Sequence, residues 1–91
     1  MKTRTIQFDK DAFMWTNNRD YNIAFLKNLF EYWKDYLTCR DYIYLDKICE
    51  SLGVNWNPDD ENVCYRKEDT LDFGFIEIDE NVYLISICKN S

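Results

Sequence analysis

The chain has 91 residues, carries 17 acidic and 11 basic side chains, contains no histidine, and has a formal net charge of −6. Hydrophobic residues make up 46% and charged residues 31% of the chain, which excludes a disordered protein and favours a folded one. No stretch approaches the roughly 18 consecutive apolar residues of a membrane span, and the first residues lack the apolar run of a secretory signal. We therefore expect residues 1–91 to form a single compact cytoplasmic domain that has no membrane partner.

The first expected elements are a strand and a long helix. Alternating side chains predict a short strand over Thr3–Phe8, and we expect Asp9–Asp20 to be irregular. Polar residues then recur with helical spacing over Asn22–Thr38, which predicts an amphipathic helix. Asp20 is the expected N-cap of this helix, because its carboxylate can accept hydrogen bonds from the free amides of the first turn.

The apolar face of this helix is unusually wide, about 200° compared with about 100° for an ordinary surface helix. One stripe contains Ile23, Leu26, Leu29, Phe30, Trp33 and Leu37, and its extension contains Phe25, Tyr32 and Tyr36. Two explanations remain open. Either other segments of the chain cover the extra width, or Tyr32 and Tyr36 contact a partner or a second copy in a homodimer. Tyrosine suits such a contact because it buries its ring while its hydroxyl stays in water.

A second, shorter helix is predicted over Tyr44–Leu52, where apolar residues again recur with helical spacing. Gly53 is placed to end this helix in a left-handed conformation. The start is ambiguous, because Asp41 or Asp46 could be the N-cap. If Asp46 is the cap, Tyr42–Leu45 is extended and only two turns of helix follow.

The last third of the chain is rich in β-branched and aromatic residues. After a loop over Val54–Glu61, we expect strands at Asn62–Arg66, Leu71–Ile78 and Val82–Cys88. Asn81 can adopt a positive φ in the tight turn before the last strand. The sequence therefore predicts an α+β fold, with two helices packed on a small antiparallel sheet of three to four strands.

The tripeptide Asp72-Phe73-Gly74 matches the magnesium-binding motif of protein kinases. The chain is too short for a kinase, lacks the histidine of the catalytic loop, and has only two glycines from which to build a phosphate loop. Gly74 instead lies within a strand pattern, where glycine marks a bulge or a close approach. We expect an aromatic ring of the first helix, Trp33 or Phe30, to lie over the gap at Gly74.

The charge is uneven along the chain, because residues 1–40 have a net charge of +2 and residues 41–91 a net charge of −8. The clustered acidic residues, which are the expected partner-binding residues together with Tyr32 and Tyr36, are Asp59, Asp60, Glu61, Glu68, Asp69, Asp72, Glu77, Asp79 and Glu80. Such clusters are commonly a solvated surface, but they also suit a face that docks on a basic protein surface. Direct nucleic-acid binding is not expected, because the basic residues that would neutralise phosphates are scattered.

Nothing in the sequence predicts a cofactor, a metal ion or a catalytic residue. The four cysteines are irregularly spaced and there is no histidine, so a zinc site is not expected. A cysteine nucleophile would lack its usual base, and Cys64 is the least implausible candidate because its surroundings are the most polar. We therefore expect a protein that is not an enzyme.

Two segments resemble small uncharacterised proteins of bacteriophages and mobile elements of Gram-positive bacteria. The segments are Tyr44-Leu45-Asp46-Lys47-Ile48-Cys49-Glu50-Ser51-Leu52-Gly53 and Leu71-Asp72-Phe73-Gly74-Phe75. In that family they take the forms Leu-Asn-x-x-Tyr-x-x-Leu-Gly and Val-Asp-Phe-Gly-Ile, so Cys49 stands in the place of the tyrosine. The resemblance implies no catalytic residue and no cofactor, and it favours an anti-defence role such as that of an anti-CRISPR inhibitor.

These observations lead to two hypotheses about function. The first is a non-enzymatic inhibitor that docks its acidic C-terminal half on the nucleic-acid-binding surface of a host protein, with carboxylates where phosphates would bind. The alternative is a structural or accessory subunit that self-associates through the aromatic residues of the first helix.

Overall fold

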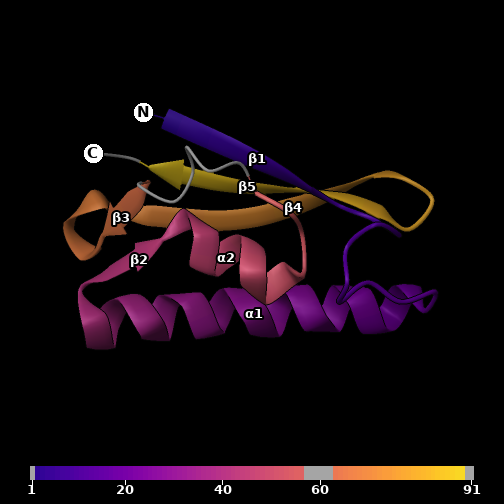
Figure 1. Cartoon of the computed structure of the whole chain (residues 1–91), viewed down its shortest axis with the longest axis horizontal. Coiled ribbons are helices and arrows are strands. Elements are labelled where there is room, and N and C mark those ends of the chain that lie inside the picture. Colours follow the sequence, from indigo (N-terminus) through magenta and orange to yellow (C-terminus); the bar gives the residue numbers. More distant parts are fainter. Residues whose placement is uncertain (1, 57–62, 90–91) are drawn as a thin grey trace.

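Three strands form an antiparallel sheet in the order β1-β5-β4 (Figure 1). The structure is a computed structural model that describes residues 2–56 and 63–89. Strand β1 (Lys2–Phe8) lies at one edge, β4 (Leu71–Asp79) lies at the other edge, and β5 (Val82–Lys89) lies between them. The register of the β4–β5 pair shifts between Glu77 and Asp79, which marks a β-bulge just before the turn.

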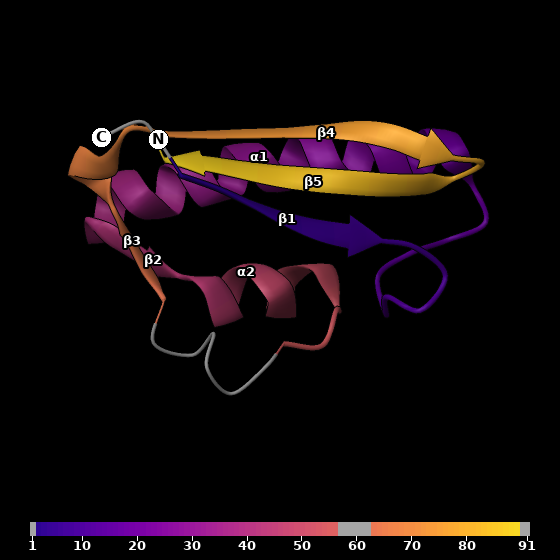
Figure 2. The same cartoon turned by 90° about the horizontal axis from the view of Figure 1, so that it is seen from above.

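The remaining elements lie on one side of this sheet. Helix α1 (Arg19–Arg40) lies beneath β4 and β5, and helix α2 (Leu45–Leu52) lies further toward β1 (Figure 2). Strands β2 (Tyr42–Tyr44) and β3 (Cys64–Arg66) form a separate antiparallel pair, and a single 3₁₀ turn, Lys67–Asp69, leads from β3 into β4. The predicted α+β fold, with two helices packed on a small antiparallel sheet of three to four strands, is confirmed: the sheet has three strands, and the pair β2–β3 forms a second small sheet. Neither described helix is long and apolar enough to cross a membrane.

Helix α1 begins and ends outside the predicted bounds, and Asp20 is not its N-cap. Asn18 is the cap, because its backbone is extended and its Oδ1 accepts a hydrogen bond of 3.0 Å from the Tyr21 amide. Asp20 instead lies in the first turn, where its negative charge interacts favourably with the helix dipole. At the other end Asp41 adopts a left-handed φ of 68° and its amide donates to the carbonyl of Leu37 over 2.8 Å.

Neither of the two candidate aspartates caps α2. The chain stays extended through Tyr44, which pairs with Cys64 across the small sheet, so the helix begins only at Leu45. The Leu45 amide donates to the Val63 carbonyl over 2.9 Å, which satisfies one of the free donors of the first turn. Asp46 therefore lies inside the first turn of the helix, as Asp20 does in α1.

The core lies between the sheet and the two helices. The side chains of β5 alternate, because Tyr83, Ile85 and Ile87 are buried while the intervening side chains are half-buried. The other buried hydrophobic residues are Phe8, Ala12, Leu26, Phe30, Trp33, Leu37, Ile43, Leu45, Ile48, Cys49, Leu52 and Tyr65. These residues come from every helix and from four of the five strands, so one continuous core joins the described elements.

The aromatic rings of α1 pack on the phenylalanines beside Gly74, and the prediction that a ring covers Gly74 is wrong. The ring of Trp33 lies 5.2 Å from that of Phe73, and the ring of Phe30 lies 6.0 Å from that of Phe75. Successive residues of a strand point to opposite faces, so Gly74 faces away from α1. A side-chain carbon built at Gly74 would have only the Ser86 hydroxyl within 4 Å, at 3.6 Å.

Gly53 ends α2 as predicted, with a φ of +73°. Its carbonyl accepts a hydrogen bond of 2.8 Å from the Phe13 amide, which brings the irregular segment before α1 onto the end of α2. A side-chain carbon at this position would lie 2.6 Å from the Cβ of Phe13 and 2.8 Å from the backbone nitrogen of Met14. Any side chain at Gly53 would therefore cause both backbone strain and a steric clash.

We predict that Gly53→Ala lowers the free energy of unfolding by about 2 kcal/mol or more, because the strain and the clash add. The matched control is Gly74→Ala, where the space is open and φ is not positive. Replacing a strand glycine there should leave stability unchanged or raise it by about 0.5 kcal/mol. Urea unfolding followed by circular dichroism measures both values, and equal stabilities for the two variants would contradict the prediction.

Candidate functional site

The structure divides the predicted acidic residues between two ends of the molecule. Strand β4 has nine residues, so its first and last residues lie about 27 Å apart. At one end lie Glu68, Asp69 and Asp72, and at the other lie Glu77, Asp79 and Glu80. The remaining three predicted residues, Asp59, Asp60 and Glu61, fall outside the described residues. The described carboxylates therefore do not form one acidic face.

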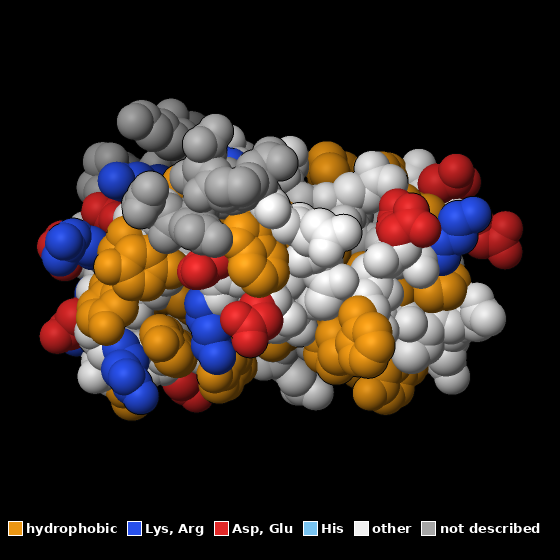
Figure 3. Space-filling model, in the orientation of Figure 1, with side chains coloured by type: hydrophobic (Ala, Val, Ile, Leu, Met, Phe, Trp, Pro, Cys, Tyr) orange, Lys and Arg blue, Asp and Glu red, His pale blue; other side chains and the backbone are white. Residues whose placement is uncertain are grey.

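The end of the molecule that contains the β4–β5 turn is acidic. We call this region the hairpin end, and its charged residues are Arg19, Asp20, Glu77, Asp79 and Glu80. This region therefore contains four carboxylates and one guanidinium. Figure 3 shows acidic side chains gathered at this end, whereas acidic and basic side chains alternate at the other end.

Asp69 has a structural role at the opposite end. It is only 9% exposed, and its Oδ2 accepts a hydrogen bond of 2.7 Å from the Arg66 amide. Its Oδ1 also lies 3.6 Å from the Lys89 ammonium group. These contacts fix the turn between β3 and β4, so little of this carboxylate can reach a partner. Glu68 and Asp72 are exposed.

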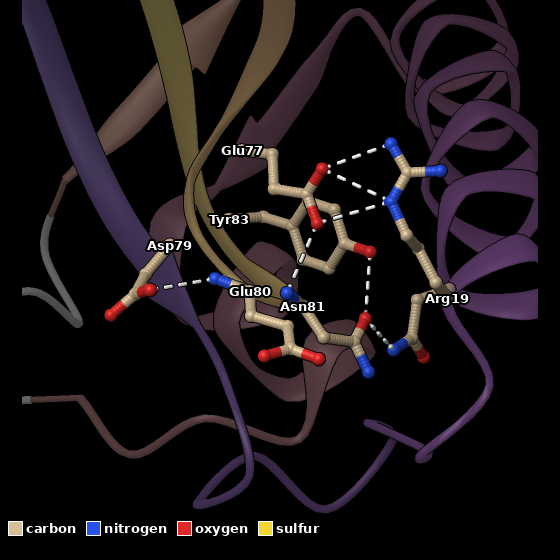
Figure 4. A network of polar contacts seen from close by, with 7 residues as sticks. Arg19, Glu77, Asp79, Glu80, Asn81 and Tyr83 are labelled. Atoms are coloured by element: carbon tan, nitrogen blue, oxygen red, sulfur yellow. Dashed lines mark hydrogen bonds and ion pairs between the residues drawn. The ribbon is translucent and has the colours of Figure 1, made fainter.

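Glu77 links the hairpin to the start of α1. The Arg19 guanidinium donates through Nε and a terminal nitrogen to the Glu77 carboxylate, with distances of 2.9–3.1 Å (Figure 4). The Asn81 amide donates to the same carboxylate over 3.0 Å. The hydrogen bond from Arg19 is the main cause of the lowered pKa of Glu77, and the hydrogen bond from the Asn81 amide lowers it further. The hydrogen bond with Glu77 in turn raises the pKa of Arg19.

Asp79 and Glu80 form the exposed tip of the hairpin end. The Asp79 carboxylate accepts a hydrogen bond of 2.8 Å from the Glu80 amide, which shapes the turn locally (Figure 4). Both side chains are exposed, and neither is paired with a described cation in the way that Glu77 is. The tip therefore presents two carboxylates to solvent.

Beneath the tip, the side chain of Asn22 is fully buried and makes every hydrogen bond that an amide can make. Its Nδ2 donates to the carbonyl of Thr16 over 2.8 Å and to the Oδ1 of Asn81 over 2.9 Å. Its Oδ1 accepts from the amide and from the hydroxyl of Thr16, both over 3.0 Å. This residue was missed as a core position, although it lies four residues before Leu26 on the apolar stripe.

Asn81 connects this buried amide to the strands and adopts the predicted positive φ, at 56°. The Tyr83 hydroxyl donates to its Oδ1 over 2.7 Å, and the Trp15 indole donates to its carbonyl over 2.8 Å. Burial raises the pKa of Tyr83, so this hydroxyl remains a hydrogen-bond donor far above neutral pH. The β4–β5 turn is thereby held by α1 and by the segment that precedes it.

The two predicted tyrosines lie on α1, away from the hairpin end. Tyr32 is 46% exposed, and its ring lies 6.2 Å from the half-buried ring of Tyr36. The charged groups of Arg40 and Lys47 lie 5.6 Å and 5.9 Å from the centre of the Tyr36 ring. Tyr36 is thus partly covered by cations of its own chain, which leaves Tyr32 as the more accessible ring.

The described residues offer little that resembles a catalytic or metal site. No group of three Cys, Asp or Glu side chains among them could hold a metal ion. Cys64 is half-buried and lines a hollow of about 490 Å³, together with Arg4 and Lys89 among others. Its sulfur lies 3.9 Å from the Tyr65 carbonyl, which is an acceptor and cannot withdraw the thiol proton as a base would.

Comparison with known proteins finds no family model, curated protein or solved structure that matches the chain. The resemblance to phage and mobile-element proteins therefore remains a prediction.

We predict that Asn22→Ala lowers the free energy of unfolding by about 2–3 kcal/mol, because it removes all four hydrogen bonds of a buried amide and leaves the Thr16 backbone amide without its acceptor. The matched control is Asn28→Ala, which removes the same amide from an exposed position of the same helix and should change stability by less than about 0.5 kcal/mol. Chemical unfolding of both variants measures the difference, and a similar small effect for both would contradict the structural role.

We predict that the stabilising effect of Glu77 disappears in acid. Its folded-state pKa lies below the ordinary value of 4.5, so its contribution is complete above that value and is lost as pH falls through the lowered pKa. Glu77→Gln should therefore lower the melting temperature at neutral pH, and its deficit should shrink between pH ~5 and pH ~2. Glu50→Gln, at an exposed position of α2, is the control and should follow the parent protein throughout. A deficit for Glu77→Gln that stays constant with pH would refute this role.

Proposed function

We propose that the protein is a non-enzymatic inhibitor whose hairpin end binds a basic, nucleic-acid-binding surface of another protein. The observation that carries the proposal is the pair of exposed carboxylates, Asp79 and Glu80, on a turn whose Asn81 is held by part-buried hydrogen bonds from Trp15, Asn22 and Tyr83. A turn already fixed before binding loses less conformational entropy when it docks. This supports a role in recognition rather than a merely solvated surface.

The charge of the hairpin end supports a basic partner. The hairpin end contains four carboxylates and one guanidinium, and the whole chain has a net charge of −6. A cluster of one sign speeds association with a surface of the opposite sign, and the effect falls as salt screens the charges. A surface that binds nucleic acid supplies the required lysines and arginines, because it must neutralise phosphates.

The resemblance of residues 44–53 and 71–75 to phage and mobile-element proteins supports a narrower proposal. A protein of such an element acts in the cytoplasm of its bacterial host, where nucleic-acid-binding defence proteins are its opponents. The partner would then be a host defence protein, and the mode of action would be that of an anti-CRISPR inhibitor. Carboxylates of the hairpin end would take the positions of phosphates.

A second candidate function is that of an accessory subunit that self-associates through α1. The exposure of Tyr32, at 46%, is the observation that favours it. A shallow hollow of about 280 Å³ adjoins this ring and is lined by Tyr36, Cys39 and Arg40 among others. An aromatic side chain beside a hollow is a common arrangement at protein interfaces.

We predict that reversing the charge of both tip residues, Asp79→Lys with Glu80→Lys, weakens partner binding about tenfold or more. The matched control, Glu50→Lys with Glu68→Lys, makes the same change in net charge at exposed positions away from the tip. The partner is first captured from a nuclease-treated bacterial lysate, identified by mass spectrometry, and purified. Its affinity for the three forms is then measured at low and high salt, with and without competing duplex DNA.

The proposal expects a captured protein that itself binds nucleic acid, is displaced by duplex DNA, and distinguishes the tip variant from the control. A captured protein that does not bind nucleic acid would refute the proposed class of partner. Equal binding of the tip variant and the control would show that the hairpin end is not the recognition site.

A further inference from the structure

One face of the three-stranded sheet is not covered by any described helix or strand, and Figure 2 looks onto this face. The strand registers place the same residues together on it, because directly paired residues share a face. We call this surface the outer face, and its residues are Thr3, Thr5, Gln7, Asp72, Gly74, Ile76, Asp79, Val82, Leu84, Ser86 and Cys88.

The outer face is poor in charge and has an apolar centre. Charged residues make up 31% of the chain, yet on this face they are confined to Asp72 and Asp79, one at each end of β4. Ile76 is 61% exposed and pairs directly with Leu84. An antiparallel sheet with one face in water ordinarily carries polar residues there, so an apolar centre indicates a contact surface.

At the centre of the outer face a pair of large side chains lies beside a pair of small ones. Ile76 and Leu84 form a ridge, and the smaller pair Gly74 and Ser86 forms the lower strip beside it, which we call the hollow. A side chain at Gly74 would meet only the Ser86 hydroxyl, so nothing in the described part of the chain fills this space. A strand glycine commonly marks the close approach of another group, and here that group does not come from the described residues.

We propose that a second copy of this chain covers the outer face. A two-fold axis that passes between the two pairs, perpendicular to the strands, places the ridge of each copy in the hollow of the other. A face without cations or clustered carboxylates suits a partner that is equally uncharged, whereas the basic partner proposed above has little to pair with there. The inference goes beyond the proposed function and does not depend on it.

The area of the outer face sets the expected strength of the dimer. Three strands of about eight residues cover about 15 by 26 Å, which is about 400 Å² in projection. This is about half of what one partner contributes to a standard interface, so we expect a weak dimer with a dissociation constant below about 1 mM. The carboxylates at the two ends of the face approach their counterparts in the other copy. Salt should therefore leave the dimer unchanged or strengthen it, whereas it weakens binding by the hairpin end.

Two substitutions test the dimer in the full chain by sedimentation equilibrium at concentrations from about 5 µM to about 1 mM. Ile76→Lys places a charge on the ridge, and Gly74→Val fills the hollow with a residue that strands favour. Each should raise the dissociation constant at least tenfold while the far-ultraviolet circular dichroism stays unchanged. Tyr32→Lys introduces the same charge at an exposed ring of α1 and should leave the dissociation constant unchanged.

Three outcomes would overturn the inference. The first is a monomer at about 1 mM, because a face of this size should associate below that concentration. The second is a dimer that Tyr32→Lys dissociates and Ile76→Lys does not, which would place the contact on α1. The third is a dimer that both outer-face variants leave intact. Asp79 belongs to both surfaces, but none of the residues substituted here lies at the tip of the hairpin end, so these variants test the dimer without changing the tip.

Discussion

The buried amide of Asn22 is the contact on which the arrangement of the molecule depends. It joins three segments that are far apart in sequence: the irregular segment before α1, α1 itself, and the β4–β5 turn. A buried amide with all its hydrogen bonds made is favourable, and the same amide with one bond missing is costly. A displacement of α1 along the sheet by one turn would break these bonds, so the amide selects one position where apolar contacts alone would tolerate several.

The two proposed contacts use different forces, and their surfaces share only Asp79. At the hairpin end the carboxylates act over several ångströms and guide a partner before contact is made. On the outer face the side chains act only at contact, by removing apolar area from water. The fold can carry both because the helices occupy just one side of the sheet, which leaves an end and a face for other molecules.

Much of the fold could be predicted because it depends on local patterns. Runs of β-branched and aromatic residues located β4 and β5, and the demands of positive φ located Gly53 and Asn81. The helix starts could not be placed from the sequence, because several residues that could act as N-caps lie near each start. Tertiary contacts determine where each helix begins. Nor could the sequence show that Asp69 is buried by its turn, or that β4 separates two acidic clusters that are neighbours in sequence. These features depend on how distant segments meet.

The bulge between Glu77 and Asp79 has a consequence for solubility. Strand β4 lies at the edge of its sheet, where unpaired backbone groups could be joined by a strand of another molecule and begin the growth of a fibre. An extra residue breaks the regular spacing of those groups and bends the end of the strand. The end of β4 is in this way less able to pair with a strand of another molecule.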